Sequence, residues 1–408
     1  MGEVIGLRCV SCGRTYSPEE VLYTCPACGD RYGTLEVIYD FDMFKGFGSD
    51  PSMWRYLSLL PVKRRSVPLR VGWTPLYRAP YIAKAHGIKE LYIKDDTVNP
   101  TSSYKDRASA IAIGVAREKG FRVISCASTG NAASSLAGLS ASVGLKSIIF
   151  VPKDTPKPKL AQIFAYGAEV YRVDGSYDDA FDLCRKVSEI KGWYNRSTAI
   201  NPYLLEGKKT GAFEIAEALS WRSPDRIFVP VGDGTIISAI CKGFKELKEV
   251  GLVKEVPQII GVQAKGAEFV KLSFERGEIV DGEAKTFADS ICVGKPRDVV
   301  KAMKYLKELN GLMISVSDDE ILSAIFELST LTGIFAEPAA AASFAGFLKM
   351  SNEDAFSSDE EIVVLITGSG LKDVDAIFKA SVDAPLVSRD PDKFLERYVE
   401  VVDFENSL

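Results

Sequence analysis

Histidine is almost absent from this chain of 408 residues, in which His86 is the only one. Its setting, AKAHGIKE, is typical of a solvated helix end before a glycine. Histidine is the usual general base and a common metal ligand near neutral pH. Its scarcity therefore argues against mechanisms built on a histidine base and against metal sites built on histidine ligands.

The sequence also lacks long apolar runs and an excess of positive charge. No stretch approaches the roughly 20 apolar residues that cross a bilayer. The first residues, MGEVIGLRCV, have neither the basic start nor the apolar core of a signal peptide. The net charge is −5, and the basic residues are scattered along the sequence. The chain therefore shows no basic cluster of the kind that binds nucleic acid. We therefore expect a cytoplasmic protein with no membrane or nucleic-acid partner.

What the chain does have is a regular alternation of apolar runs and helical patterns. Hydrophobic residues make up 46% of it, enough for two or three domains with sizeable cores. The expected strands are LYIK, RVISCAS, KSIIFVP, AEVYRV, RIFVPVG, QIIGVQA and EIVVLI. The expected helices cover 104–119, 131–143, 157–166, 177–191, a stretch from about 235, 296–309, 318–332 and 337–349. This pattern predicts parallel sheets covered by helices on both faces, in two α/β domains with a cleft between them.

Four of the eight cysteines fall in the first 28 residues, as Cys9-x2-Cys12 and Cys25-x2-Cys28. A glycine follows the second cysteine of each pair, which favours the tight turn of a zinc knuckle. Four thiolates complete a tetrahedral zinc site and leave no open position, so such a site is structural. Two disulfides are the alternative, and they are less expected inside a cell. We predict a structural zinc ribbon at the N-terminus.

Residues 99–108 read NPTSSYKDRA and place Lys105 at the start of an expected helix. A lysine amine can form a Schiff base with an aldehyde, which is how proteins hold pyridoxal phosphate. The helix N-terminus and the neighbouring Arg107 are expected to favour the deprotonated amine. Taken alone, a lysine followed by aspartate and arginine at a helix start is most simply a solvated surface residue. Other segments of the chain must decide between these interpretations.

Two such segments are CASTGN at 126–131 and TGSGLKD at 367–373, each at the end of an apolar run. In this order the three segments resemble the fold-type II pyridoxal-phosphate enzymes, which are tryptophan synthase β-like, and in particular the threonine synthase family. The resemblance covers nearly the whole chain. It implies pyridoxal phosphate as cofactor, a homodimer, and two doubly wound three-layer α/β domains behind the ribbon.

The resemblance also implies a division of the chain. The zinc ribbon is expected at 1–40, and a C-terminal tail at 386–408. A large cofactor-binding domain is expected from 41–97 together with 200–385. Residues 98–199, between its two parts, are expected to form a small mobile domain.

For the cofactor, the resemblance assigns roles residue by residue. Lys105 is expected to hold the aldehyde and, once freed, to act as a general base at the substrate's α-carbon. The turn Gly232-Asp233-Gly234-Thr235 is expected to bind the cofactor phosphate through backbone amides and the dipole of the following helix. The negative side chain of Asp233 should then point away. Thr367 is expected to bond the pyridine nitrogen, and Asn131 the ring oxygen.

For the substrate, the loop Ser128-Thr129-Gly130 offers hydroxyls and amides suited to an amino acid's carboxylate. Its alternative is a plain N-terminal cap for the helix that begins near residue 131, and one loop can serve both purposes. Either way, these residues lie on the strand-to-helix turn that precedes Asn131.

The resemblance is weaker at the positions where threonine synthases bind the phosphate of O-phospho-L-homoserine. Familiar members carry Asn-Ser-x-Asn-Pro-x-Arg-Leu-Glu-Gly-Gln-Lys-Thr, whereas this chain reads TAINPYLLEGKKT over 198–210. Leu204 replaces the arginine that would grip phosphate with two parallel bonds. Ala199 and Ala132 replace polar residues. New cations that could rebuild this site occur nearby: Lys208, which replaces the glutamine and is expected to bind substrate, and Lys295 and Arg297 in GKPRD.

Two PLP-dependent enzyme functions on a small amino acid follow from this mixture, and the nearer one is a carbon–oxygen lyase. One is a threonine synthase-like reaction, from O-phospho-L-homoserine to L-threonine and phosphate. The other is an ammonia-lyase of the threonine or serine dehydratase type, or a β/γ-replacement enzyme, on an unphosphorylated amino acid. A catalytically silent ligand sensor is a third possibility, and the presence of Lys105, Asn131 and Thr367 argues against it.

Overall fold

The computed structural model describes residues 4–197, 200–378 and 384–395. The chain forms two compact units, residues 1–373 and residues 374–408. The second unit contains the short helix α14 (Asp375–Phe378). All the elements discussed below belong to the first unit.

The N-terminal residues form a small three-stranded antiparallel sheet in the order β2-β1-β3. Its strands are β1 (Val4–Cys9), β2 (Thr15–Tyr16) and β3 (Leu35–Tyr39), with the one-turn helix α1 (Gly29–Tyr32) before the last. The two glycines that follow the cysteine pairs, Gly13 and Gly29, have φ angles of 74° and 66°. This is the left-handed conformation that a glycine adopts most easily, as the knuckle pattern predicted.

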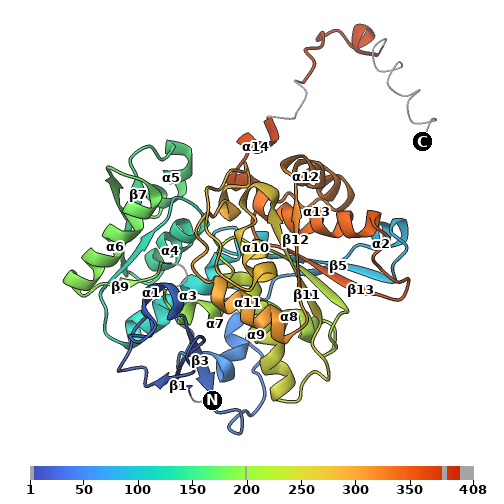
Figure 1. Cartoon of the computed structure of the whole chain (residues 1–408). Helices are drawn as coiled ribbons and strands as arrows, with labels where there is room; N and C mark the ends of the chain where they lie inside the picture. The colour runs from blue at the N-terminus through green and yellow to red at the C-terminus, as the bar shows by residue number, and fades with distance from the viewer. Residues whose placement is uncertain (1–3, 198–199, 379–383, 396–408) are drawn as a thin grey trace. The chain divides into compact units, whose positions relative to one another are not determined.

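A four-stranded parallel sheet has the order β8-β7-β6-β9. Its strands are β6 (Val123–Ala127), β7 (Lys146–Pro152), β8 (Glu169–Val173) and β9 (Tyr194–Asn195). The helices connecting them are α4 (Asn131–Ala141), α5 (Lys157–Ala165) and α6 (Tyr177–Lys191) (Figure 1). The chain runs outward from β6 to β8 and then returns to β9 on the other side of β6. The sheet therefore has a topological switch point between β6 and β9.

A six-stranded sheet has the order β12-β11-β10-β13-β5-β4, parallel except for the edge strand β4. Its strands are β4 (Leu76–Arg78), β5 (Glu90–Asp95), β10 (Arg226–Pro230), β11 (Gln258–Ala264), β12 (Leu312–Val316) and β13 (Glu361–Ile366). Its main helices are α9 (Thr235–Glu249), α11 (Val299–Glu308), α12 (Asp318–Thr332) and α13 (Pro338–Asn352). Here the switch point lies between β10 and β13.

Two helices, α3 (Lys105–Glu118) and α7 (Tyr203–Lys208), pack directly against each other. Their contact depends on Gly207, because a Cβ at this position would collide with the backbone carbonyl of Arg107. Helix α3 also packs against α4, and its residues from Asp106 to Ala116 are buried. Lys105 is therefore the first residue of a helix surrounded by other elements, and the interpretation of Lys105 as a solvated surface residue is wrong.

The helical and strand patterns locate most of the large elements. The expected helices 177–191 and 318–332 coincide with α6 and α12, which both begin with a capping box, at Ser176 and Ser317. The helix expected over 296–309 begins only at Val299. The aromatic stretch after residue 53 forms a buried 3-10 helix, η1 (Met53–Leu59). No helix within the described ranges is long and apolar enough to cross a membrane.

Candidate active site

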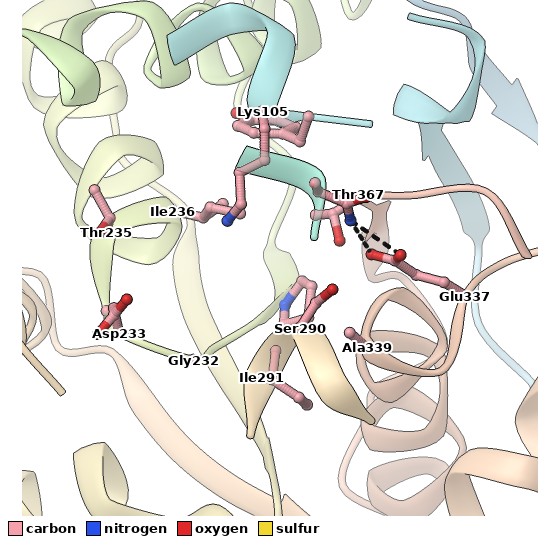
Figure 2. Close-up of a pocket in the computed structure, with 14 residues that line it drawn as sticks. Lys105, Gly232, Asp233, Thr235, Ile236, Ser290, Ile291, Glu337, Ala339 and Thr367 are labelled. Carbon is pink, nitrogen blue, oxygen red and sulfur yellow. Dashed lines mark hydrogen bonds between the residues drawn. The ribbon is translucent and has the colours of Figure 1, made fainter. Parts of the chain in front are cut away.

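A narrow cavity lies at the carboxyl ends of β10 and β13, where the six-stranded sheet has its switch point. Figure 2 shows Lys105 extending into it, with the glycine-rich turn on one side and Thr367 and Glu337 on the other. All seven residues predicted to bind the cofactor line this cavity: Lys105, Asn131, Gly232, Asp233, Gly234, Thr235 and Thr367. The structure thus brings together residues up to 262 positions apart in the sequence (105 to 367).

Lys105 is half-buried, and the pKa of its amine is lowered from the ordinary value of 10.5. Burial is the main cause, because it disfavours the charged form, and the positive charge of Arg196 adds to it. Asp233 and Glu337 act in the opposite direction. A lowered pKa increases the fraction of neutral amine, which is the form that attacks an aldehyde.

Arg107 does not play the part that the sequence indicated. Its guanidinium donates to both carboxylate oxygens of Asp96, at 2.7 and 2.9 Å, and to both of Glu214, at 2.5 and 2.7 Å. Lys94 donates to the same Glu214 at 2.7 Å. Two buried cations are thus matched by two buried carboxylates. Arg107 is neutralised locally, and the arginine that lowers the pKa of Lys105 is Arg196.

The glycine-rich turn fits a phosphate group. Gly234 has a φ of 94° and stands before the first residue of α9, where no side chain caps the helix. The first backbone amides of a helix have no partner within it, and the helix dipole favours an anion there. In addition, the Thr235 hydroxyl is buried and has no hydrogen-bond partner among the described residues. A phosphate would satisfy these donors.

Asp233 in the same turn is directed onto a neighbouring loop. Its Oδ1 accepts from the backbone N–H of Arg297 at 3.1 Å, and its carbonyl accepts from the N–H of Asp298 at 3.1 Å. The carboxylate thereby braces the turn against the loop before α11. This is a physical reason why a carboxylate is tolerated beside a phosphate site.

The opposite wall of the cavity contains a residue that the sequence did not single out. Asn131 donates from Nδ2 to the two carboxylate oxygens of Glu337, at 2.8 and 3.0 Å (Figure 2). Burial raises the pKa of Glu337, and the bond from Asn131 opposes this shift. Glu337 precedes Pro338, the first residue of α13. An acidic residue before a proline at a helix start was the signal that could have found it.

The loop after β6 opens onto a neighbouring hollow. Thr129 and Gly130 line it together with Asn131 and Lys372. Ser128 accepts a hydrogen bond from the backbone N–H of Gly130 at 3.2 Å and forms a local turn. No side chain caps α4, so the alternative of a plain hydroxyl cap does not describe this loop. The amide of Ala133 donates to the Gly130 carbonyl at 3.0 Å, which leaves the two amides before it, at the very start of α4, available to another acceptor.

The residues with which threonine synthases bind the substrate's phosphate are replaced by other residues in this chain, as the sequence indicates. Leu204 is 1% exposed and packs in the main hydrophobic core, and Ala132 is 8% exposed on α4. Ala199 and its neighbour Thr198 lie outside the described residues. Lys208, the last residue of α7, is 1% exposed. Burial lowers its pKa well below 10.5, and the charges of Lys105 and Arg196 lower it further.

The other two candidate cations, Lys295 and Arg297, are engaged elsewhere. Arg297 forms an ion pair with Asp178 of α6 at 2.6 Å, and its guanidinium lies 4.0 Å from the centre of the Phe181 ring. Lys295 lies 3.8 Å from the same Asp178 and is largely exposed. These cations tie the loop before α11 to helix α6, so they do not supply an unpaired positive charge to the site.

The four N-terminal cysteines converge. Their sulfur atoms all lie within 4.8 Å of one another, and that of Cys12 lies 3.9 Å from that of Cys25. A tetrahedral zinc ion with zinc–sulfur distances of about 2.3 Å would place the sulfurs about 3.8 Å apart. All four cysteines, Cys9, Cys12, Cys25 and Cys28, are free thiols, so the disulfide alternative is not realised in this structure. The donor set fits a structural zinc ion.

Comparison with known proteins agrees with the interpretation of the site. Residues 67–368 match the family model of pyridoxal-phosphate dependent enzymes. A threonine synthase from Methanocaldococcus jannaschii is 43% identical over 387 residues, which cover 92% of this chain and 94% of the relative. One from Methanosarcina acetivorans is 38% identical over 399 residues, covering 96% and 98%.

Solved structures show the same fold. The processed form of threonine deaminase isoform 2 from Solanum lycopersicum superposes with a TM-score of 0.66 at 25% identity, over 76% of this chain and 88% of that one. Diaminopropionate ammonia lyase from Escherichia coli gives 0.66 at 18% identity, over 84% and 96%. The chain therefore belongs to the fold-type II pyridoxal-phosphate dependent enzymes. Within them it is a member of the threonine synthase family.

Proposed function

We propose that this protein is a threonine synthase, a lyase that converts O-phospho-L-homoserine to L-threonine and phosphate. The observation that carries the proposal is the half-buried amine of Lys105, set in a cavity between an uncapped helix N-terminus and Thr367. The named activity of relatives that are 35–43% identical over most of the chain supports this choice of reaction.

The proposed cofactor is pyridoxal phosphate, held by Lys105, the turn at 232–235, Asn131 and Thr367. When bound, it withdraws electrons from the substrate's α-carbon. The lowered pKa of Lys105 increases the fraction of neutral amine. This neutral amine can accept a proton from the substrate's α-carbon. Thr367 offers a neutral hydroxyl to the cofactor ring.

The proposed substrate contacts lie next to this site. The amides and hydroxyls of Ser128, Thr129 and Gly130 would bind the substrate's carboxylate. Since Thr129 and Gly130 share their hollow with Asn131, which also lines the cofactor cavity, the two groups of contacts border adjacent hollows. A small amino acid could therefore reach the cofactor and the carboxylate loop together.

A second candidate function is an ammonia-lyase or replacement reaction on an unphosphorylated amino acid. The observation in its favour is Leu204, which is buried in the apolar core where a phosphate-binding arginine would be expected. The solved neighbours include a threonine deaminase and an ammonia lyase, in keeping with either reaction.

One assay separates the two candidates. The purified protein, loaded with pyridoxal phosphate, is given O-phospho-L-homoserine, and released phosphate and L-threonine are measured together. The same preparation is given L-threonine and L-serine, and keto acid is measured. Threonine and phosphate in equal amounts support the proposal. Keto acid without phosphate release supports the second candidate.

We also propose that the cysteines of the ribbon bind one zinc ion. Metal analysis of the purified protein should find one zinc per chain, and a variant with Cys12→Ser and Cys25→Ser should contain none. Because the Thr34 hydroxyl of the ribbon donates to Asp298 at 3.0 Å, loss of the metal should also lower the melting temperature of the body. A wild-type protein without zinc, or a variant that keeps it, would contradict the assignment.

Three further features of the protein are proposed on the family resemblance. They are a homodimer in solution, a cytoplasmic location and a small mobile domain at 98–199 beside a larger one built from 41–97 and 200–385, with a tail at 386–408. Sedimentation velocity with and without the substrate tests the first and the last: one dimeric species is expected, and it should become more compact when substrate binds.

A further inference from the structure

The loop directly before helix α11 lies between the N-terminal ribbon and the glycine-rich turn. We call residues 296–298 of this loop the bracing loop. On the ribbon side, the Thr34 hydroxyl donates to Oδ1 of Asp298 at 3.0 Å, and Nη1 of Arg31 donates to the carbonyl oxygen of Pro296 at 2.9 Å. The ribbon therefore holds both ends of the bracing loop.

On its other side, the bracing loop holds the glycine-rich turn. The backbone N–H of Arg297 donates to Oδ1 of Asp233 at 3.1 Å, and that of Asp298 donates to the carbonyl oxygen of Asp233 at 3.1 Å. The packing is close as well, because a Cβ added at Gly234 would lie 2.9 Å from the Cβ of Ala302 and 3.2 Å from the carbonyl oxygen of Asp298. The conformation of the turn is therefore tied to the position of the bracing loop.

The bond between Thr34 and Asp298 is buried. Thr34 is 4% exposed and Asp298 is 0% exposed. The same carboxylate pairs with Lys301 at 3.2 Å. Hydrogen bonds to a charged group are stronger than those between neutral groups, and a buried carboxylate that loses a donor has little access to water as a replacement. Loss of the Thr34 hydroxyl should therefore disturb the position of Asp298.

Thr34 is itself held in place by both cysteine loops of the ribbon. The backbone N–H of Val10, which follows Cys9, donates to the carbonyl oxygen of Thr34 at 3.0 Å. The backbone N–H of Cys25 donates to the carbonyl oxygen of Gly33 at 2.8 Å. A continuous series of hydrogen bonds thus runs from the cysteine loops through the bracing loop to the glycine-rich turn.

We propose that the ribbon positions the turn that binds the cofactor's phosphate. Thr34 and Arg31 hold the bracing loop, and the bracing loop holds Asp233, so that the amides of the turn face the phosphate before it binds. The inference rests on the proposed function, which assigns the cofactor's phosphate to the glycine-rich turn. Thr34 and Asp298 are positioning residues, because neither is among the described residues that line the cavity.

The physical benefit of this arrangement is preorganisation. A glycine-rich turn has many conformations available to it, and ordering it at the moment of binding would cost affinity. Two hydrogen bonds from the bracing loop to Asp233 restrict the turn in advance. The ribbon therefore contributes to cofactor affinity from outside the cavity.

The test compares two ligands of the full-length apoenzyme, pyridoxal phosphate and pyridoxal, which has the same aldehyde and no phosphate. Thr34→Val removes the hydroxyl and keeps the shape of the side chain. It should raise the Kd for pyridoxal phosphate about 5- to 20-fold and change the Kd for pyridoxal less than about twofold. Thr34→Ser keeps the hydroxyl and should recover most of the affinity. Arg31 is only half-buried, so Arg31→Gln tests the same loop with less risk to folding, and it should weaken pyridoxal phosphate alone by about 2- to 5-fold.

Two further variants serve as controls. Tyr305→Phe removes another buried hydrogen bond between the ribbon and α11, from the Tyr305 hydroxyl to Glu36, which does not involve the bracing loop. Both Kd values should stay within about twofold of the wild type. Thr235→Val removes a hydroxyl of the turn itself, so it should weaken pyridoxal phosphate and not pyridoxal. This variant tests the phosphate assignment independently of the ribbon.

Two results would overturn the proposal while the phosphate assignment stands. If Thr235→Val weakens pyridoxal phosphate but Thr34→Val and Arg31→Gln do not, the turn needs no support from the ribbon. If Thr34→Val weakens both ligands equally, the ribbon supports the fold in general and not the phosphate turn.

Failure of the proposed function gives a different pattern. If Thr235→Val changes neither Kd, the turn does not bind the cofactor's phosphate, and the inference fails with that assignment. If the wild type binds pyridoxal phosphate but releases no phosphate from O-phospho-L-homoserine, the threonine synthase assignment fails. The Kd values of the two ligands then still decide whether the ribbon positions the turn.

Discussion

Two groups of buried charge lie within two residues of each other at the start of helix α3, and they are built on opposite principles. Around Arg107, the ion-pair cluster joins two cations, Arg107 and Lys94, to two carboxylates, Asp96 and Glu214. Around Lys105, the cationic cluster of Lys105, Arg196 and Lys208 is opposed by the carboxylates of Asp233 and Glu337, which accept hydrogen bonds from uncharged donors. The charges of the first group form ion pairs, whereas among the described residues no ion pair joins those of the second.

The difference distinguishes a charge cluster that stabilises the fold from one that lies at the candidate active site. A complete buried network costs little to keep and much to break, because removing one member leaves the others without a partner. An incomplete one is maintained against an energetic penalty, which is offset when ligands arrive. The Lys105 amine also benefits from this imbalance, since a neighbouring positive charge lowers its pKa.

Replacing Lys105 by alanine should give the largest effect on activity. We expect turnover to fall more than about a thousandfold, because both the covalent anchor and the proton acceptor are lost. The visible absorbance of the lysine-bound cofactor should disappear, while circular dichroism stays unchanged. A variant that keeps both the absorbance and the turnover would show that another lysine is the anchor.

Replacing Arg107 by methionine should instead act on stability. Two buried carboxylates lose their main partner, and the free energy of unfolding should fall by about 3–5 kcal/mol. Chemical denaturation of the apoenzyme measures the change. Lys208→Gln, which removes an unpaired buried charge, is the comparison and should lose far less. Equal losses in the two variants would mean that both clusters are structural.

The pH dependence of cofactor uptake reports the lowered pKa of Lys105. Burial, with Arg196 as the next cause, lowers this pKa below 10.5, and only the neutral amine reacts with the aldehyde. As pH rises through the pKa the amine loses its proton, so the uptake rate of the apoenzyme should rise and level off below pH 10.5. Arg196→Gln should move the midpoint upward by removing one cause. A midpoint that does not move would exclude Arg196 as a cause.

The repeating strands and helices of the fold, and the binding motifs that occupy a single turn, could be predicted from the sequence. Helices such as α6 and α12 were located to the residue because their capping boxes and closing glycines are local signals. The four cysteines and the glycine-rich turn are local as well. Their convergence and the cavity around Lys105 followed from motif order, which parallel sheets translate into proximity at one edge.

The residues that pair with each buried charge could not be predicted from the sequence in the same way. Arg107 is two residues from Lys105, and sequence proximity suggested that its charge acts there, but carboxylates from the 3-10 helix η2 (Asp96–Val98) and from α8 (Thr210–Ala218) neutralise it. Arg196 is 91 residues from Lys105 (196 − 105) and lies beside it because of the switch point after β9. Glu337 was missed for the same reason. Which buried charges are paired depends on tertiary contacts between distant segments.

The most direct test of the central claim compares phosphate release from O-phospho-L-homoserine by the cofactor-loaded wild type and the Lys105→Ala variant given the same cofactor. We predict that the wild type forms L-threonine and phosphate in equal amounts and that the variant forms neither, because Lys105 is both the anchor and the proton acceptor. Equal release of phosphate by the two proteins would contradict the claim that Lys105 carries the reaction.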